Sequence, residues 1–371
     1  MSRLLPPQAG ALLTIDLDAI RDNWLTLKGR LGGAADCAAV VKADAYGLGA
    51  RKVAPALYQA GCRHFFVAHL AEAIDLRPVL AADTAIYVLH GVHPGAEAEC
   101  AAHGLVPVIN SLHQLTAWRS LARQSGKVLP AVLQVDTGMA RLGLAADELD
   151  RVAADHGLLA GIELKFVMSH LASAEDQASP LNRMQLENFR AALARLPATR
   201  ASLANSSGIF LGPDYHFDLV RPGAALYGVA PVAGQPNPLR PVIRLQGKVL
   251  QTRTIEAGTA VGYSHTWTAQ RPSRIATVAV GYADGYLRSL SNRGEVHVDS
   301  VRLPIVGNVS MDTITVDITD VPEGRVGEGA LVDLAYPGHG VDDIAGRAGT
   351  IGYEILTSLG NRYSRAYLGA M

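Results

Sequence analysis

Between about residue 37 and residue 221, short apolar runs alternate with amphipathic stretches, and this alternation limits the possible folds more than any other feature of the chain. Short apolar runs are typical of buried strands in a parallel sheet, and amphipathic stretches are typical of the helices that cover it. Eight such runs with helices between them predict a closed (β/α)8 barrel. The predicted strands are residues 37–42, 64–69, 85–90, 105–109, 131–136, 162–170, 201–205 and 217–221.

The hydrophobic pattern changes after the predicted barrel. From RPVIRLQGKVLQTRTI onward apolar and polar residues alternate, as in MDTITVDI (311–318), which predicts antiparallel strands. The segment PVAGQPNP (231–238) is rich in proline and glycine and marks the boundary. We therefore expect an α/β chain with a TIM-type barrel over residues 11–235 and a mostly antiparallel β domain over 236–371. Residues 1–10 are expected to associate with the β domain. A helix is expected near the end of the chain, in TIGYEILTSLGNRYSRAYLG.

Composition and charge exclude several classes of protein. The 371 residues carry 33 basic and 34 acidic side chains, and this near-zero balance is unlike that of proteins that bind nucleic acid or anionic membranes. No apolar run approaches the ~20 residues of a membrane span, and prolines interrupt the start of the chain where a signal peptide would lie. The three cysteines, Cys37, Cys62 and Cys100, form no CxxC pair, which favours free thiols in a reducing cytoplasm.

Polar side chains follow each of the eight predicted strands. A barrel carries its active site at the carboxyl ends of its strands, so these residues are the first candidates for a site. Each of them alone is an ordinary loop residue, but polar ends around one rim favour a site without defining its chemistry. The candidates are Lys42, His69, His90, Asn110, Asp136 with Arg141, His170, Asn205 with Ser206, and Arg221.

Lys42 is the candidate with the clearest chemistry. It stands in AVVKADAYGLGA, where an apolar strand delivers a lysine to its end. Burial lowers the pKa of a lysine and makes it a plausible Schiff-base amine. A lone lysine at a strand end is more often simply solvated, so other motifs of the chain are needed to distinguish the two interpretations.

The motif AVVKADAYGLG resembles the pyridoxal-phosphate lysine motif of the alanine racemase family, and further motifs of that family follow in the same order. The ordered set covers nearly the whole chain, so the chain is identified as a member of this family. The resemblance implies interconversion of L- and D-alanine, either to supply D-alanine for peptidoglycan or to catabolise alanine. The further motifs are VDTGMARLG, VMSHLASA, LANSSG, VRPGAALYG, VGYSHTW, VAVGYADGY, VGNVSMD and TIGYE.

By this resemblance two residues move the α-proton of alanine on opposite faces. Lys42 holds the cofactor covalently and serves the D-alanine face, and Tyr263 of the neighbouring subunit of a homodimer serves the L-alanine face. Two groups on opposite faces suit a racemisation. A tyrosine with a pKa near ~10 is a poor base at neutral pH, and in the family a hydrogen-bonded chain through the equivalents of His170 and Arg221 assists it.

The resemblance also implies which residues hold pyridoxal 5'-phosphate, with no metal involved. Arg221 faces the pyridine nitrogen, and because an arginine only donates hydrogen bonds, the ring is a weaker electron sink and racemisation is favoured over transamination. Backbone amides and hydroxyls bind the phosphate, as in an anion nest. The phosphate positions are Tyr46, Ser206, Gly223, Ala224 and Tyr353.

The remaining positions concern the substrate. Arg141 matches the residue that contacts the cofactor phenolate oxygen and the substrate carboxylate, which suits a planar fork of donors. Met311 of the second subunit matches the residue that closes the substrate site. Tyr282 and Asp312 match residues that line its entry.

Two positions depart from the family pattern. Many members have a carbamylated lysine where this chain has Gln134, so we expect either another anion, such as chloride, beside Arg141 or an Arg141 that is less firmly held. A histidine of the arginine network is replaced by Ser202, which predicts a more mobile Arg221.

Three other readings compete with an alanine racemase. A non-catalytic pyridoxal-phosphate carrier has the barrel but lacks the β domain that VGYSHTW and VSMD indicate here. A barrel decarboxylase of the ornithine or diaminopimelate type places a carboxylate at the pyridine nitrogen, where this chain has Arg221. A broad-specificity racemase would carry an export signal.

Overall fold

The computed structural model describes residues 7–299 and 301–369, which form two compact units. One unit spans residues 20–239, and the other combines the described residues up to Ala19 with those from Arg240 onward. The sequence pattern predicts residues 11–235 for the barrel. Strand β1 (Ala11–Asp16) belongs instead to the second unit, because it pairs antiparallel with β11 (Ile243–Ile255) and parallel with β19 (Ser364–Leu368). Of the predicted N-terminal segment 1–10, residues 1–6 lie outside the described residues.

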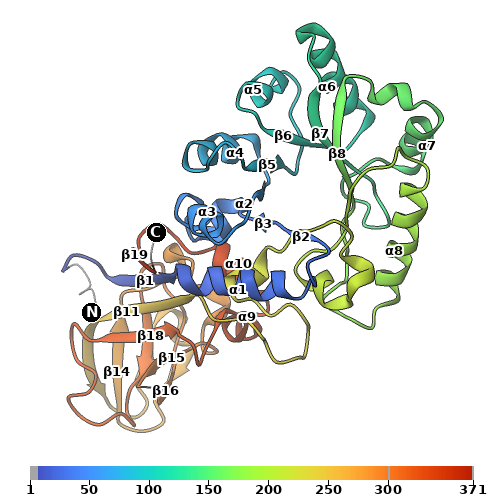
Figure 1. Cartoon of the computed structure of the whole chain (residues 1–371). Helices are drawn as coiled ribbons and strands as arrows, with labels where there is room; N and C mark the ends of the chain where they lie inside the picture. Colours follow the sequence, from blue (N-terminus) through green and yellow to red (C-terminus); the bar gives the residue numbers. More distant parts are fainter. Residues whose placement is uncertain (1–6, 300, 370–371) are drawn as a thin grey trace. The chain divides into compact units, whose positions relative to one another are not determined.

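The barrel unit is built on a curled parallel sheet with the strand order β3-β4-β5-β6-β7-β8-β9 (Figure 1). Strand β10 then pairs parallel with β2, and the Arg221 amide donates to the Ala204 carbonyl at 2.9 Å, which joins β9 to β10 and closes the sheet. These strands confirm the predicted barrel class. Their bounds are β2 Asp36–Cys37, β3 Ala39–Val40, β4 His64–Val67, β5 Ala85–Val88, β6 Val106–Ile109, β7 Leu129–Gln134, β8 Ile162–Met168, β9 Ala201–Ser202 and β10 Leu219–Val220.

Helices connect these strands and lie on the outside of the curled sheet (Figure 1). Helix α6 shows why they form where they do: the Ser111 side chain caps its first turn by accepting from the Gln114 amide, and Gly126 ends it with φ 64°. Its buried face includes Leu115 and Trp118. The helices are α1 Leu17–Gly29, α3 Ala50–Gln59, α4 Leu70–Leu76, α5 Glu97–Ala102, α6 Leu112–Ser125, α7 Ala146–Ala154 and α8 Pro180–Leu193, and the short element α2, Lys42–Gly47, has a left-handed backbone.

The C-terminal unit is a mostly antiparallel β structure, as predicted. Its main sheet has the order β16-β15-β18-β11-β1-β19, and β14 pairs with both β11 and β17. Side chains of β1 alternate between buried and half-buried, so one face of this strand packs on the core. The other elements are β12 Ala260–Val261, β13 Trp267–Thr268, β14 Ser273–Val278, β15 Glu295–Val298, β16 Val301–Pro304, β17 Ile314–Asp317, β18 Leu331–Ala335, α9 Val341–Ala348 and α10 Gly352–Thr357.

The tail of the chain differs from the single helix expected there. Helix α10 ends at Thr357, and residues 364–368 form strand β19 beside β1. Gly360 lies between the two elements, and its amide donates to the Asp284 carbonyl at 2.9 Å. A strand partner from the opposite end of the chain, which no local pattern reveals, therefore decides the structure of the tail.

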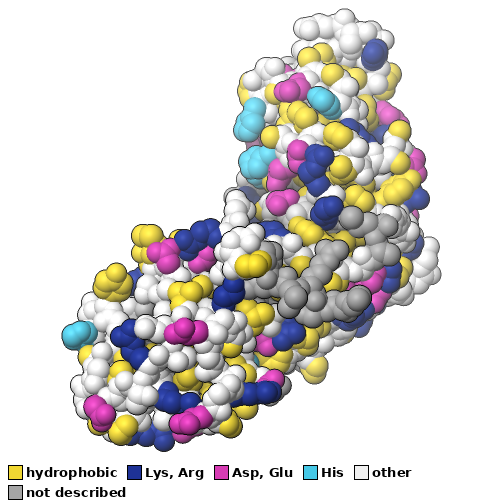
Figure 2. All heavy atoms as spheres, turned by 90° about the vertical axis from the view of Figure 1, so that its left-hand side faces the viewer, with side chains coloured by type: hydrophobic (Ala, Val, Ile, Leu, Met, Phe, Trp, Pro, Cys, Tyr) yellow, Lys and Arg dark blue, Asp and Glu magenta, His cyan; other side chains and the backbone are white. Residues whose placement is uncertain are grey.

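The surface agrees with the balanced composition. Basic and acidic side chains are interspersed over the face in Figure 2. Within the described ranges, no helix has both the length and the apolar character needed to cross a bilayer.

Candidate active site

Lys42 is followed by a left-handed backbone turn. It lies two residues after the end of β3, and the next four residues, Ala43 to Tyr46, all have φ between 51° and 55°. Each L-residue in this region costs roughly 1–2 kcal/mol, and such strain concentrates at functional sites. The turn brings the Tyr46 hydroxyl against Gly223, where an added Cβ would clash with it. The strained backbone therefore joins the lysine to the neighbourhood of Gly223.

Glu72 holds the start of this turn, and the sequence analysis missed it. Its Oε1 accepts the Ala43 amide at 2.6 Å, and its Oε2 accepts the Ala68 and His69 amides at 2.8 and 2.9 Å. Burial is the largest cause of the lowered pKa of Lys42, the charge of Arg141 lowers it further, and Glu72 opposes both. A glutamate three residues after the first residue before a helix, here His69, is a capping pattern that could have indicated its role.

The loop that carries Arg141 is fixed by Asp136. This carboxylate accepts the amides of residues 138, 139 and 140 at 2.9 to 3.0 Å, and these three bonds outweigh burial and lower the pKa of Asp136. The loop closes where Gly143, with φ 108°, passes so near the Asp136 amide that a Cβ would lie 2.7 Å from it. Arg141 itself is exposed on this rigid loop.

Gln134 contributes to the same loop through the backbone. Its Nε2 donates to the Leu142 carbonyl at 3.0 Å, next to Arg141. Among the described contacts it forms no hydrogen bond with the guanidinium of Arg141. Gln134 thus fixes the loop, and its neutral side chain supplies no negative charge to balance Arg141.

Arg221 is a buried cation held by several oxygens. Its Nη2 donates to the carbonyls of Ser169 and Leu203 at 2.6 and 3.3 Å, and its Nη1 donates to the Ser202 hydroxyl. Burial lowers the pKa of Arg221 to about 9, so it is charged at neutral pH. Because Ser202 itself accepts a bond from Arg221, these contacts argue against the mobile arginine that the departure at this position predicted.

His170 lies near three cations. Burial, followed by the charges of Arg221, Arg141 and Lys42, lowers the pKa of His170 to about 3. The imidazole is therefore neutral at neutral pH and can accept a hydrogen bond. No hydrogen bond between this ring and Arg221 occurs among the described residues.

Ser206 forms a cradle with the following strand end. Its hydroxyl oxygen accepts the Gly223 amide at 2.9 Å and the Ala225 amide at 3.3 Å, and it is buried. Ala224, which the sequence analysis named, lies between these two amides, whereas Ala225 was missed. Amides and hydroxyls that converge in this way are suited to an anion.

Four other strand-end residues have local roles. Asn110 donates to the carbonyls of Leu89 and Val108, and Asn205 accepts the Gly208 amide at 2.9 Å. The rings of His69 and His90 meet edge to face with centroids 4.6 Å apart. The polar rim is thus partly structural.

The predicted residues of the C-terminal unit share one surface. Tyr263 and Met311 are 72% and 54% exposed, and Tyr282 is also exposed. Backbone bonds link their segments, since the Tyr282 amide donates to the Ser310 carbonyl at 3.0 Å and the Tyr263 carbonyl accepts from Asn308 at 2.9 Å. Large side chains exposed together are typical of a surface that another protein chain covers.

Arg362 organises this surface and was also missed. It forms a two-pronged ion pair with buried Asp284 at 2.6 and 2.8 Å and contacts Asp312 at 2.6 Å. These hydrogen bonds raise the pKa of Arg362. Tyr353, the fifth predicted residue of this unit, lies in α10.

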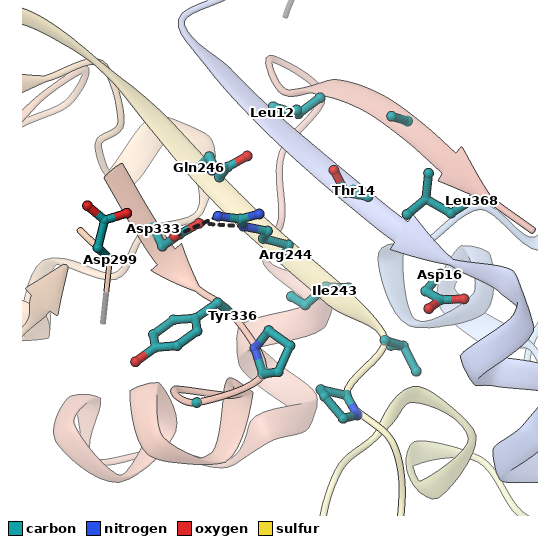
Figure 3. Close-up of a pocket in the computed structure, with 15 residues that line it drawn as sticks. Leu12, Thr14, Asp16, Ile243, Arg244, Gln246, Asp299, Asp333, Tyr336 and Leu368 are labelled. Carbon is teal, nitrogen blue, oxygen red and sulfur yellow. Dashed lines mark hydrogen bonds and ion pairs between the residues drawn. The ribbon is translucent and has the colours of Figure 1, made fainter. Parts of the chain in front are cut away.

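A separate cavity of about 700 Å³ lies within the C-terminal unit and contains none of the predicted site residues (Figure 3). It follows β1 and β11, with Leu12, Thr14 and Asp16 on one side and the Arg244–Asp333 ion pair on the other. Arg244 spans to Asp333 with two bonds of 2.6 and 2.9 Å. Since this cavity contains no predicted site residue, the candidate site is described from the barrel rim and the surface around Tyr263 and Met311.

The predicted residues thus form two groups, one in each unit. The barrel group contains Lys42, Tyr46, Gln134, Arg141, His170, Ser202, Ser206, Arg221, Gly223 and Ala224, and the second group contains Tyr263, Tyr282, Met311, Asp312 and Tyr353.

The fold is a parallel barrel followed by a β domain, and a partly buried lysine lies at the end of a barrel strand. Comparison with known proteins shows that this combination belongs to an amino-acid racemase of the barrel type. Residues 15–231 match the family model "Alanine racemase, N-terminal domain", and residues 242–367 match "Alanine racemase, C-terminal domain". The chain therefore belongs to the alanine racemase family. This confirms the family resemblance and the enzyme class.

Individual relatives agree over nearly the full length. "Alanine racemase, catabolic" of Agrobacterium fabrum is 54% identical, covering 97% of this chain and 92% of that protein. Alanine racemase of Brucella abortus is 52% identical, covering 97% of this chain and 94% of that protein. The crystal structure of alanine racemase from Bartonella henselae matches with a TM-score of 0.94 at 46% identity, covering 97% of this chain and 100% of that chain. That structure has covalently bound pyridoxal phosphate.

Proposed function

We propose that this protein interconverts L- and D-alanine with pyridoxal 5'-phosphate, and that Lys42 and Tyr263 transfer the α-proton on opposite faces of the substrate. The observation that supports this best is the environment of Lys42, whose pKa is lowered by burial and by Arg141. A lowered pKa makes the free amine, with its lone pair, easier to form. Lys42 can therefore both hold the cofactor and accept a proton.

The residues of the barrel rim fit this cofactor. The Ser206 hydroxyl with the Gly223 and Ala225 amides suits the phosphate, and Tyr46 lies against Gly223. Arg221 is a buried donor that suits an unprotonated ring nitrogen. Bound there, pyridoxal phosphate supplies the electron sink that makes the α-proton of an amino acid acidic. Ala224, between the two amides, and Tyr353 complete the proposed phosphate positions.

The other residues position the substrate, keep His170 uncharged and enclose the site. Arg141 orients the substrate carboxylate from its fixed loop. His170 is neutral and accepts a hydrogen bond from the Tyr263 hydroxyl of the neighbouring subunit, and the charge of Arg221 disfavours a charged imidazole. Met311 closes the site, while Tyr282 and Asp312 line its entry.

We propose that two chains form a homodimer with shared active sites. Tyr263 and Met311 are both exposed in the single chain, as expected of side chains that reach a partner's cofactor. We also propose a cytoplasmic location, because Cys37, Cys62 and Cys100 are all free and buried, which suits a reducing compartment.

The test is the formation of D-alanine from L-alanine by purified protein with added pyridoxal phosphate. Lys42→Ala should abolish conversion, and Tyr263→Phe should lower kcat by roughly 10²–10⁴-fold while the cofactor spectrum stays unchanged. Lys127→Ala, an exposed lysine far along the chain, and Tyr215→Phe serve as controls. Full activity of Tyr263→Phe, or cofactor binding without conversion of alanine, would refute the proposal.

The shared site has its own test. Concatenated heterodimers that combine a Lys42→Ala chain with a Tyr263→Phe chain contain either one intact site or two damaged ones, depending on the subunit that supplies Tyr263. Residual activity near half of wild type supports shared sites. A monomeric preparation with full turnover contradicts them.

A further inference from the structure

Glu295, His297 and His339 meet inside the C-terminal unit, away from every residue assigned above. Their ligand atoms lie within 4.8 Å of one another, and all three side chains are more than nine-tenths buried. Histidine and carboxylate side chains in such groups are the ordinary protein ligands of Zn²⁺. The cluster therefore calls for a physical explanation.

The distances within the cluster are those of ligands rather than of hydrogen-bond partners. Glu295 Oε1 lies 3.7 Å from His297 Nε2 and 3.5 Å from His339 Nδ1, and neither ring donates a hydrogen bond to it. Two ligands bound to one tetrahedral ion at ~2.0–2.1 Å are separated by about 3.4 Å. An ion between the three atoms would need only small side-chain movements.

His297 lacks the hydrogen bonds that a buried imidazole needs. Its Nδ1 is buried without a partner among the described atoms, and its Nε2 faces Glu295 beyond hydrogen-bond range. The ring instead packs against Tyr336 and His339. A buried polar group without a partner is costly, and an ion bound to Nε2 would give that nitrogen the partner that Glu295, at 3.7 Å, does not supply.

The second carboxylate oxygen of Glu295, Oε2, already has two cations beside it. Arg302 Nε and Arg347 Nη2 lie 2.5 and 2.7 Å from Glu295 Oε2, although neither contact is aligned as a hydrogen bond. These two cations contact the oxygen that faces away from the imidazoles. Oε1 is left facing both histidine rings, as in a metal ligand oriented by a second group.

The backbone around the cluster is rigid and the cluster is accessible. Glu295 and His297 are two residues apart on β15 and so share one face of the strand, and His339 lies in a tight turn in which its amide and carbonyl both bond to Tyr336, at 2.9 and 3.0 Å. A cavity of about 520 Å³ reaches the three side chains, and Asp342 and Asp343 line it as well. Carboxylates at the entrance favour the approach of a cation.

We propose that Glu295, His297 and His339 form a binding site for a divalent transition-metal ion of the Zn²⁺ class, with water in the fourth position. Two imidazoles and one carboxylate select Zn²⁺, Co²⁺ or Ni²⁺ over Mg²⁺ and Ca²⁺, which prefer oxygen ligands only. The ion links β15 to the turn before α9 and stabilises the C-terminal unit. This inference does not depend on the activity of the barrel rim.

The test uses tag-free holoenzyme stripped of metal with a chelator. Calorimetric titration with Zn²⁺ should give one ion per chain and a raised melting temperature. His297→Ala and His339→Ala should weaken binding at least tenfold, whereas His103→Ala, an exposed histidine of the barrel unit, should not. Equal binding by all four proteins, or binding by none, overturns the proposal.

Two measurements on the wild-type protein decide the matter if a variant does not fold. Crystals soaked in Zn²⁺ should show an anomalous peak between the three side chains at the zinc absorption edge. Co²⁺ in place of Zn²⁺ should give the intense visible absorption of a four-coordinate ion. A peak only elsewhere on the surface, or the weak spectrum of hydrated Co²⁺, rules the site out.

Discussion

The Arg221 guanidinium donates a hydrogen bond to the hydroxyl of Ser202, and that hydroxyl in turn donates to the Leu219 carbonyl at 2.5 Å. A serine, small and uncharged, thus completes the set of acceptors around a buried cation. The contact gives Ser202 a definite role at a position where the family resemblance led us to expect a looser arginine.

Ser202→Ala removes this acceptor without adding volume. We expect a loss of roughly 1–3 kcal/mol in the free energy of unfolding, because one guanidinium nitrogen remains buried and unpaired. We also expect kcat to fall up to tenfold, which corresponds to about 1.4 kcal/mol. Chemical denaturation and steady-state kinetics measure the two effects.

Ser273→Ala is the matched control, since Ser273 is equally buried and makes one hydrogen bond in the other unit. It should lose stability without a change in kcat. If both variants keep wild-type kcat, Ser202 has no influence on the site through Arg221.

Glu72 raises the pKa of Lys42 against burial and Arg141. Glu72→Gln removes the negative charge that stabilises the ammonium form, so the pKa of Lys42 falls further. The amine is then free at lower pH, and the rate at which apoenzyme captures pyridoxal phosphate should reach its plateau at lower pH. Stopped-flow absorbance across a pH series measures this shift.

Glu148→Gln offers a close control, because Glu148 accepts the Leu112 and Ala145 amides in the same way at the start of α7. Its pH profile should coincide with that of wild type. A Glu72→Gln profile that does not move, or moves to higher pH, would show that this charge does not act on Lys42.

Arg362→Ala breaks both ion pairs of Arg362 and leaves the carboxylate of Asp284 buried without its cation. We expect a lower melting temperature and a raised KM for alanine, because Asp312 is released as well. Arg271→Ala removes an exposed pair with Asp320 and should change neither quantity. Indistinguishable melting curves for the two variants would contradict this role.

Ala43→Gly tests the left-handed turn. Glycine removes a cost of roughly 1–2 kcal/mol but loses about 0.5–1 kcal/mol of chain entropy, so the free energy of unfolding should stay level or rise by up to about 1.5 kcal/mol. Ala191→Gly, at an exposed position of the right-handed helix α8, should lower it by about 1 kcal/mol. Urea unfolding compares them, and equal losses would mean that the turn is not left-handed in solution.

The sequence alone predicted the barrel well because each of its strands is a short apolar run followed by a polar residue. It failed where partners are far apart. Arg362 meets Asp284 across 78 positions, and β19 pairs with β1 from the other end of the chain, so neither contact leaves a local pattern. Long-range pairing of this kind is fixed by packing.

The left-handed turn after Lys42 escaped prediction for a different reason. The region with positive φ favours glycine and asparagine, whereas this chain has Ala43, Ala45 and Tyr46 there. Local preference therefore pointed the wrong way. The surrounding contacts, such as those of Glu72, overrule it.

The same turn has a stereochemical consequence. For a residue of opposite chirality the favoured and disfavoured backbone regions exchange places, so a D-residue is relaxed at φ near 50°. Chemical synthesis could therefore place D-alanine at positions 43 and 45 with a gain in stability. Beside its central lysine, this member of the alanine racemase family has a backbone better suited to D-alanine than to the L-alanine that the ribosome inserts.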